Sequence, residues 1–185
     1  ITVVPVLASA GHYADVVLPE ALARNRRYAD VRLRRSPPVG THAGIAPLVA
    51  RRVTELLRDG RAARDQLSLL LVGHGTRRHA DSRASTLQLA ETLRRRRVAG
   101  EVLTGFLDDD PSIEATVAQA ALPTLVVIPF LIGGGTHTVE DLPHRVGAAG
   151  GRRVVIDHAV GAYAGLEEIV VDLARRPMPP PAASN

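Results

Sequence analysis

Two histidines occupy glycine-rich segments that directly follow apolar runs. His74 lies between two glycines after the run 67–72, and His137 follows the glycines 133–135 after the run 124–132. Neutral imidazole is a good ligand for divalent first-row transition metals, and it also serves as a general base near neutral pH. Two imidazoles at one place therefore point to metal binding combined with proton transfer.

The segments that must position these histidines alternate between short apolar runs and amphipathic stretches. The runs are rich in Val, Ile and Leu, which is typical of buried parallel strands. The pattern predicts strands at 67–72, 101–107, 124–130 and 152–156, and helices at 81–97, 111–121, 139–148 and 162–175. Asp110 is expected to cap the second of these helices, with Pro111 at its first position.

This alternation predicts an α/β fold with a parallel four-stranded sheet and helices on both faces. In the flavodoxin-like strand order 2-1-3-4, the first and third strands are neighbours about 4.8 Å apart. Their carboxyl ends carry His74 and His137, which are 63 positions apart in the chain. We therefore expect both imidazoles at one edge of the sheet, where each nitrogen reaches a shared cation at about 2.1 Å.

The chain contains two copies of one pattern, which predicts a tandem duplication. Residues 3–19 resemble 127–143, and residues 39–53 resemble 160–174. The segment that carries His74 has no counterpart in the first copy, so the first copy is expected to be incomplete. The expected units are the C-terminal half of a first unit at 1–61, a complete second unit at 62–176 and a disordered tail at 177–185.

Composition excludes several classes of protein. The chain has no cysteine, which rules out disulfides and thiolate metal sites. The basic run Arg94–Arg97 has no interleaved aromatic residues, which argues against nucleic acid as a partner. No apolar stretch approaches the roughly 18 residues of a membrane span and no signal peptide is present, so we expect a cytoplasmic protein. No G-x-x-x-x-G-K-S/T motif is present, so no nucleotide is expected.

The two histidine segments together resemble the class II chelatases, specifically the sirohydrochlorin cobalt- or ferrochelatases. The matching motifs are His74-Gly75-Thr76, Pro129-Phe130-Leu131, Gly135, His137 and Asp141-Leu142-Pro143. Members of that family consist of one short unit or of two fused units. The resemblance implies a lyase that inserts Co²⁺ or Fe²⁺ into sirohydrochlorin or a related tetrapyrrole without ATP, in cobalamin or siroheme biosynthesis.

The resemblance also implies roles for individual residues. His74 and His137 would be both metal ligands and catalytic bases, with Asp108 and Glu140 as further candidate metal ligands. The candidate contacts to the tetrapyrrole and its carboxylates are Gly75, Thr76, Arg77, Arg78, Arg83, Gly134, Gly135 and Thr136. The three arginines fit a solvated helix face equally well. His12 aligns with Thr136, and it is either a vestige or a residue that faces the cleft from the first unit.

Other functions fit parts of the pattern. The phosphohistidine phosphatases also have a strand that runs into Arg-His-Gly, but Gly73 stands where that family has its arginine. A non-catalytic protein that carries Co²⁺ or Ni²⁺ would also use paired histidines, which do not distinguish these metals from Fe²⁺. An incomplete first unit leaves a sheet edge exposed, which predicts either a homo-oligomer or a missing N-terminal segment.

Overall fold

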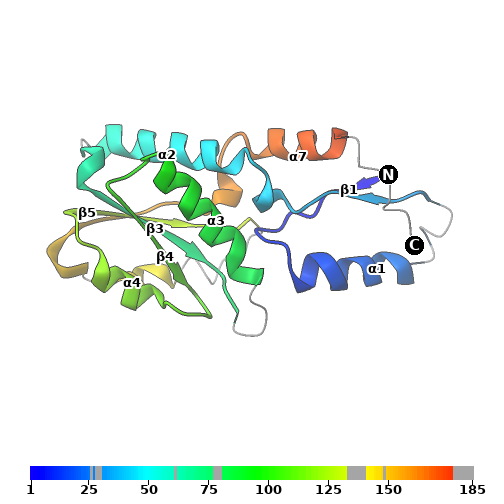
Figure 1. Cartoon of the computed structure of the whole chain (residues 1–185), viewed down its shortest axis with the longest axis horizontal. Helices are drawn as coiled ribbons and strands as arrows, with labels where there is room; N and C mark the ends of the chain where they lie inside the picture. Colours follow the sequence, from blue (N-terminus) through cyan, green and yellow to red (C-terminus); the bar gives the residue numbers. More distant parts are fainter. Residues whose placement is uncertain are drawn as a thin grey trace.

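The central element of the fold is a four-stranded parallel sheet (Figure 1). The computed structural model describes residues 1–25, 27, 31–60, 62–76, 81–132, 141–147 and 149–176. In spatial order the strands are β4 (Glu101–Phe106), β3 (Leu67–Gly73), β5 (Thr124–Pro129) and β6 (Arg153–Ile156). All three pairings are parallel, so the expected fold class and the strand order 2-1-3-4 are confirmed.

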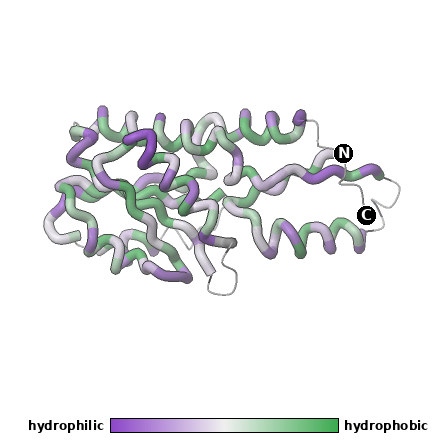
Figure 2. Tube along the Cα trace, viewed as in Figure 1, coloured by the Kyte–Doolittle hydropathy of each residue, from purple (hydrophilic) through white to green (hydrophobic). Residues whose placement is uncertain are grey.

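Alternate residues of the strands contribute to two apolar cores, one on each face of the sheet. Leu69 and Leu71 of β3 belong to one core, whereas Leu70 and Val72 belong to the other, because successive strand residues point to opposite faces. The covering helices are α2 (Ile45–Gly60) and α3 (Asp81–Arg95) on the first face, and α4 (Ile113–Gln119) and α6 (Leu142–Val146) on the second. α7 (Leu166–Arg175) extends the first core beyond the sheet. The central strands are correspondingly the hydrophobic part of the chain in Figure 2.

The start of α4 differs from the sequence expectation. Ser112 is the N-cap, and its hydroxyl accepts a hydrogen bond from the amide of Ala115 at 3.2 Å. Asp110 and Pro111 precede the helix, because the carbonyl of Pro111 accepts a hydrogen bond from the amide of Phe106 at 3.0 Å and keeps this segment extended beside the end of β4. The assignment of Asp110 as the cap and Pro111 as the first helical residue was therefore wrong.

Residues 1–61, expected from the sequence repeat to be an incomplete first copy, contribute a smaller set of elements. β1 (Thr2–Val3) pairs in parallel with β2 (Arg34–Arg35), and a π-helical turn (Tyr13–Val17) leads into α1 (Leu18–Arg24). A turn of 3₁₀ helix (Val39–Thr41) precedes α2.

One backbone contact recurs in both copies. The amide of Gly40 donates to the carbonyl of Leu7, and the amide of Gly161 donates to the carbonyl of Leu131, each at 2.9 Å. A Cβ atom at Gly40 would lie 2.1 Å from the carbonyl oxygen of Ala8, and one at Gly161 would lie 2.2 Å from that of Ile132. Both copies therefore require glycine at this crossing of two chain segments.

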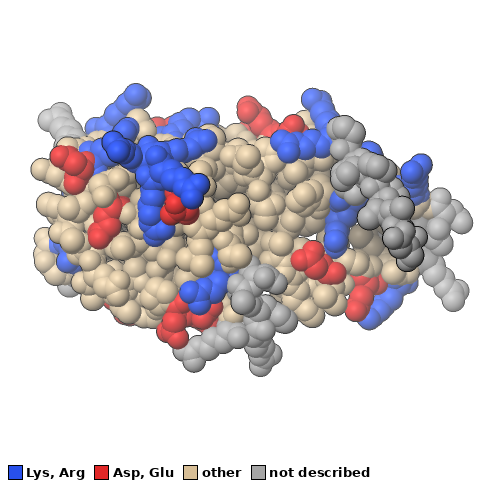
Figure 3. All heavy atoms as spheres, viewed as in Figure 1, with Lys and Arg blue, Asp and Glu red and all other residues tan. Residues whose placement is uncertain are grey.

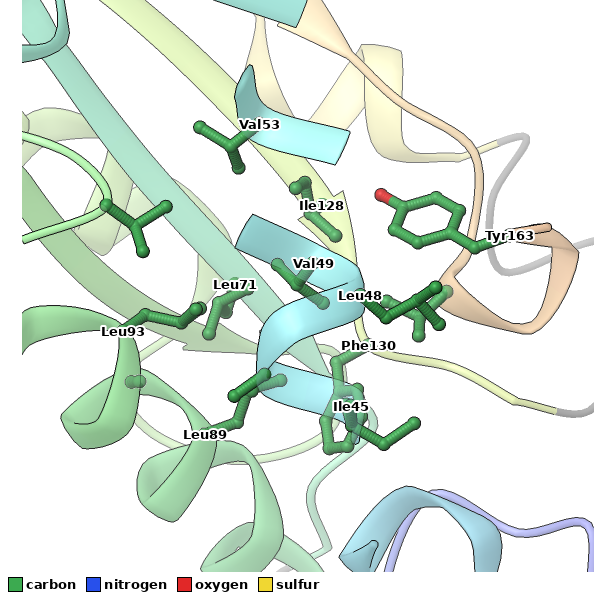
Figure 4. Packing of buried hydrophobic residues seen from close by; sticks show 14 of the residues in the cluster. Ile45, Leu48, Val49, Val53, Leu71, Leu89, Leu93, Ile128, Phe130 and Tyr163 are labelled. Atoms are coloured by element: carbon green, nitrogen blue, oxygen red, sulfur yellow. The ribbon is translucent and has the colours of Figure 1, made fainter. Parts of the chain in front are cut away.

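The long helix of each copy lies on the other copy. α2 comes from the first copy, yet its residues Leu48, Val49 and Val53 pack beside Leu71 and Ile128 of the second copy's sheet (Figure 4). α7 comes from the second copy and contacts the 3₁₀ turn of the first. Figure 1 shows the two helices end to end along one side of the molecule, with α2 over the four-stranded sheet and α7 over the N-terminal elements.

Two polar clusters hold the exchanged helices. On α2, the guanidinium of Arg52 donates to both carboxylate oxygens of Asp157, at 2.8 and 2.7 Å, and the hydroxyl of Tyr163 donates to the same carboxylate at 2.7 Å. On α7, Asp172 lies 2.8 Å from Nε2 of His42. His42 and Tyr163 occupy equivalent positions in the repeated sequence pattern, and each of them contacts an aspartate.

The outer surface carries many arginines. Figure 3 shows basic side chains gathered over the face that carries α2 and α3. Arg94 uses its guanidinium within the protein, since Nε and Nη2 both donate to the carbonyl of Val102 on the edge strand β4, at 3.0 and 2.8 Å. Among the helices of the described segments, none is long and apolar enough to cross a membrane.

Candidate functional site

His74 lies at the carboxyl end of β3, directly after the last strand residue. The backbone amides of Leu107 and Asp108, just beyond β4, both donate to the carbonyl of His74, at 3.1 and 3.0 Å. The amide of Leu107 also reaches the carbonyl of Gly73 at 3.1 Å. The main chain of His74 is therefore fixed to the neighbouring strand, while its side chain remains 64% exposed.

The orientation of the His74 ring leaves one nitrogen available. Nδ1 lies 2.9 Å from the carbonyl oxygen of Gly75. Because a carbonyl oxygen only accepts hydrogen bonds, the neutral ring carries its proton on Nδ1 and has its lone pair on Nε2. Nε2 is then the atom that binds a metal or accepts a proton, and the contact to Gly75 fixes the tautomer in the way that is usual for metal-binding histidines.

Gly75 makes the tight bend after His74 possible. Its φ is +67°, a left-handed conformation that glycine adopts far more easily than other residues. A Cβ atom there would lie 2.7 Å from Cβ of Asp109 and 2.9 Å from Cβ of Phe106. The packing of β4 and the loop after it therefore requires glycine at position 75.

Two neighbouring carboxylates beside His74 have different surroundings. Asp108 is 66% exposed, and its Oδ2 lies 3.5 Å from Nδ1 of His74. Asp109 is only 10% exposed and pairs with Arg83 at 3.7 Å. The guanidinium carbon of Arg83 also lies 5.3 Å from the centre of the Phe106 ring, a cation–π contact. Asp108 is thus accessible to solvent beside His74, whereas Asp109 is largely buried and paired with Arg83.

A further residue near the site is Arg145 of α6, which the sequence analysis did not identify. Its guanidinium binds the carboxylate of Glu114 on α4 through Nε at 2.7 Å and Nη2 at 3.1 Å. Nη1 donates to the carbonyl of Leu107 at 3.1 Å. The hydrogen bonds from Arg145 hold the pKa of Glu114 at about 2, well below its ordinary value of 4.5. Arg145 lies in no recognisable motif, so only its tertiary contacts reveal it.

The remaining candidate residues divide into two groups. Thr76 is described and is half-buried, and His12 is exposed and makes an edge-to-face contact with the Tyr13 ring at 6.2 Å. The other candidates lie outside the described residues: His137, Glu140, Arg77, Arg78, Gly134, Gly135 and Thr136. Within the described segments, no three His, Asp or Glu side chains come together as a possible metal site. The pairing of His74 with His137 therefore stays a prediction.

Solved structures share the fold over nearly the whole chain. The chain superposes with a TM-score of 0.77 on CbiX, described as the terminal enzyme for biosynthesis of siroheme in denitrifying bacteria, at 19% identity over 92% of this chain and 73% of that one. DR2241 from Deinococcus radiodurans, a multi-domain protein with structural similarity to chelatases, gives 0.77 at 24% identity over 94% and 40%. SirB from Bacillus subtilis with Fe³⁺ gives 0.75 at 20% identity over 95% and 70%.

The sequence comparisons are more specific than the fold. The chain is 34% identical over 107 residues to a probable sirohydrochlorin cobaltochelatase from Halobacterium salinarum, covering 57% of this chain. It spans about a third of the length of that relative, 36%. The model of the CbiX family matches residues 1–56 and 68–176, and these stretches include His74, His137 and the motifs around them. The resemblance seen in the sequence is thereby confirmed, and the chain belongs to the CbiX family.

Proposed function

We propose that this chain inserts a divalent metal, Co²⁺ or Fe²⁺, into sirohydrochlorin or a related tetrapyrrole without ATP, in cobalamin or siroheme biosynthesis. The observation that carries the proposal is the His74 ring, which presents Nε2 at the carboxyl edge of the sheet while its Nδ1 is bound to Gly75. The name of the Halobacterium salinarum relative, a probable sirohydrochlorin cobaltochelatase, supports the same reaction.

The reaction exchanges two protons for one metal ion. A free-base tetrapyrrole loses its two pyrrole N–H protons as the divalent cation enters, so the site must deliver a cation and accept protons. Nε2 of His74 is suited to either task, since the lone pair of a neutral imidazole binds these metals reversibly or accepts a proton. We assign the second imidazole to His137, with Asp108 beside His74 as an additional ligand or proton acceptor.

The substrate carboxylates require cationic partners. In the proposed complex, Arg77 and Arg78 bind these carboxylates, while Gly75, Thr76 and the segment 134–136 approach the flat ring. Arg83 already contacts Asp109 and Phe106, so its role as a substrate contact requires it to leave or share the Asp109 carboxylate.

The phosphatase alternative is disfavoured by the packing around Gly73. A Cβ atom at this position would lie 2.5 Å from the hydroxyl oxygen of Thr86 and 3.0 Å from the Phe106 ring. An arginine, which the phosphohistidine phosphatases place here, has no room in this backbone arrangement. The packing around Gly73 therefore argues against a phosphate-binding side chain at this position of β3.

The proposed function is tested by following the tetrapyrrole absorption spectrum after mixing the protein, Co²⁺ and sirohydrochlorin. We expect His74→Ala and His137→Ala each to slow metal insertion at least about 100-fold, because general-base groups contribute on this scale. His158→Ala is the matched control, since His158 is exposed and lines the groove between α2 and the start of α7, and it should leave the rate unchanged. Binding of Co²⁺ or Ni²⁺ without any acceleration of insertion would instead establish a metal carrier.

A further inference from the structure

The guanidinium of Arg145 joins three elements around the site. Arg145 belongs to α6, eight residues after His137 in the chain. Its Nε and Nη2 contact both oxygens of Glu114 on α4, at 2.7 and 3.1 Å. Its Nη1 contacts the carbonyl of Leu107 at the end of β4, at 3.1 Å. A two-point contact to a carboxylate fixes the plane of a guanidinium, so the third contact is also fixed in direction.

The contact to Leu107 continues into the main chain of His74. The peptide units of Leu107 and Asp108 donate both of their amide hydrogens to the carbonyl of His74, at 3.1 and 3.0 Å. In the opposite direction, the amide of Arg145 donates to the carbonyl of Asp141, the residue that directly precedes α6, at 3.1 Å. Hydrogen bonds made by Arg145 and by the main chain of Leu107 and Asp108 therefore connect the start of α6 with the backbone of His74.

The surroundings of Arg145 favour a fixed geometry. Its side chain is largely covered, with 26% exposed. Glu114 raises the pKa of Arg145 through its hydrogen bonds, and the charges of Asp108 and Asp141 act in the same direction. The cation is therefore held among carboxylates from α4, from the loop after β4 and from the start of α6, which makes its displacement by solvent unfavourable.

We propose that Arg145 is a positioning residue that fixes the loop after β4, and through it the main chain of His74, relative to α6, so that Nε2 of His74 and the carboxylate of Asp108 keep the geometry that metal insertion requires. This proposal rests on the proposed function. Arg145 touches neither the metal nor the tetrapyrrole. It acts through Leu107 on one side and through the first turn of α6 on the other.

The test compares three variants of the whole chain. Arg145→Gln removes both the positive charge and the two-point contact to the carboxylate, whereas Arg145→Lys keeps the charge but not the two-point contact. Arg95→Gln, which removes an exposed ion pair with Glu91 within α3, is the matched control. Each protein is assayed well below its thermal midpoint for Co²⁺ affinity without tetrapyrrole, for kcat and KM separately, and for amide hydrogen exchange in the peptides that cover 105–110.

We expect Arg145→Gln to bind Co²⁺ about 10-fold more weakly, as is usual when an outer partner of a metal ligand is lost. Its kcat should fall by about the same factor while KM for the tetrapyrrole stays within about two-fold, because the substrate contacts remain. Exchange at 105–110 should become faster. Arg145→Lys should restore less than half of the loss in kcat, and Arg95→Gln should match the wild type in every measurement.

Two results would overturn the proposal. One is an Arg145→Gln variant that keeps the Co²⁺ affinity and kcat of the wild type, whether or not exchange at 105–110 becomes faster, because the contact would then be structural only. The other is full recovery by Arg145→Lys, which would show that charge alone matters. A wild-type protein that neither binds Co²⁺ nor accelerates insertion would refute the proposed function itself, and this is seen before any variant is compared.

Discussion

The bend after β3 combines an unusual backbone angle with crowding from a neighbouring strand. Gly75 has φ +67°, and Phe106 and Asp109 occupy the space that a side chain would need. The bend directs the carbonyl of Gly75 back to Nδ1 of His74, at 2.9 Å. The same glycine therefore shapes the backbone and selects the tautomer of the imidazole.

Gly75→Ala should therefore lower the free energy of unfolding by more than the strain of the left-handed backbone angle alone. A non-glycine residue in a left-handed conformation costs on the order of 1 kcal/mol, and the short contacts to Asp109 and Phe106 add to this. We expect urea denaturation to show a loss of about 2–3 kcal/mol, together with a large loss of Co²⁺ affinity. Gly151→Ala is the control, since Gly151 has φ +79° with no atom within 4 Å of the added Cβ. Equal losses in the two variants would contradict this account.

A functional residue can be predicted from the sequence more easily when it belongs to a local motif than when its role depends on tertiary contacts. His74 could be predicted because an imidazole between two glycines after an apolar run is unusual in itself. Arg145 could not, because a helical arginine in an arginine-rich chain carries no local signal. Its partners Glu114 and Leu107 are 31 and 38 positions away, and only the folded chain brings them to it.

At the scale of elements, the apolar runs predicted the strands, and the flavodoxin-like order expected for them is observed, whereas the ends of the helices were less predictable. The Asp110-Pro111 pair has the composition of a helix start, but Ser112 provides the cap. The local pattern was overridden by the hydrogen bond between Phe106 and Pro111, which depends on how the chain returns along β4. Asp and Ser are both favoured as N-cap residues, so the path of the backbone decides which of Asp110 and Ser112 caps the helix.

The contact between α4 and α6 predicts a specific dependence of stability on pH. Arg145 lowers the pKa of Glu114 from 4.5 to about 2, so the folded state favours the ionised carboxylate. This stabilisation is complete above the unfolded pKa and is lost as pH falls from 4.5 through about 2. Urea denaturation of the wild type and of Glu114→Gln should differ most above pH 5 and converge toward about pH 2.

The matched control for this prediction is Glu91→Gln, which removes an exposed pair with Arg95 inside a single helix, at 2.8 Å. Exposed pairs of this type contribute only about 0.3–0.5 kcal/mol, so its stability should follow that of the wild type closely at every pH. Curves for Glu114→Gln that run parallel to those of the wild type over the whole range would contradict the assignment.

At the scale of the whole molecule, the main feature is the exchange of α2 and α7 between the two copies expected from the sequence repeat. The sequence showed that residues 39–53 resemble 160–174, but a resemblance between two segments does not say which sheet each of them covers. The two polar clusters that hold the exchange also escaped prediction, because Arg52 and Asp157 are 105 positions apart. Long-range pairing of this kind has no local signature.

The two clusters should differ in their contribution to stability. Asp157 is 3% exposed and binds Arg52 and Tyr163, whereas Asp172 is 47% exposed. Asp157→Ala leaves the buried hydroxyl of Tyr163 unpaired and leaves the guanidinium of Arg52 only its 3.3 Å contact to Glu55, and we expect a loss of about 3 kcal/mol in the free energy of unfolding. Asp172→Ala should cost less than about 1 kcal/mol, as is typical for exposed pairs. The measurement is urea denaturation at pH 7, and similar values for both variants would refute the comparison.

The exchange of helices also bears on how such a chain changes length during evolution. A fragment that contains only residues 62–176 would lose α2 and uncover the apolar face of β3 and β5. The sequence of α7 resembles that of α2, so the fragment has a substitute helix of its own that must either fold back across its own sheet or cross to the sheet of a second molecule. The short connection at 157–165 then decides between a monomer and a domain-swapped dimer. If this connection is too short for the chain to turn back, α7 cannot reach its own sheet and packs on that of a second molecule.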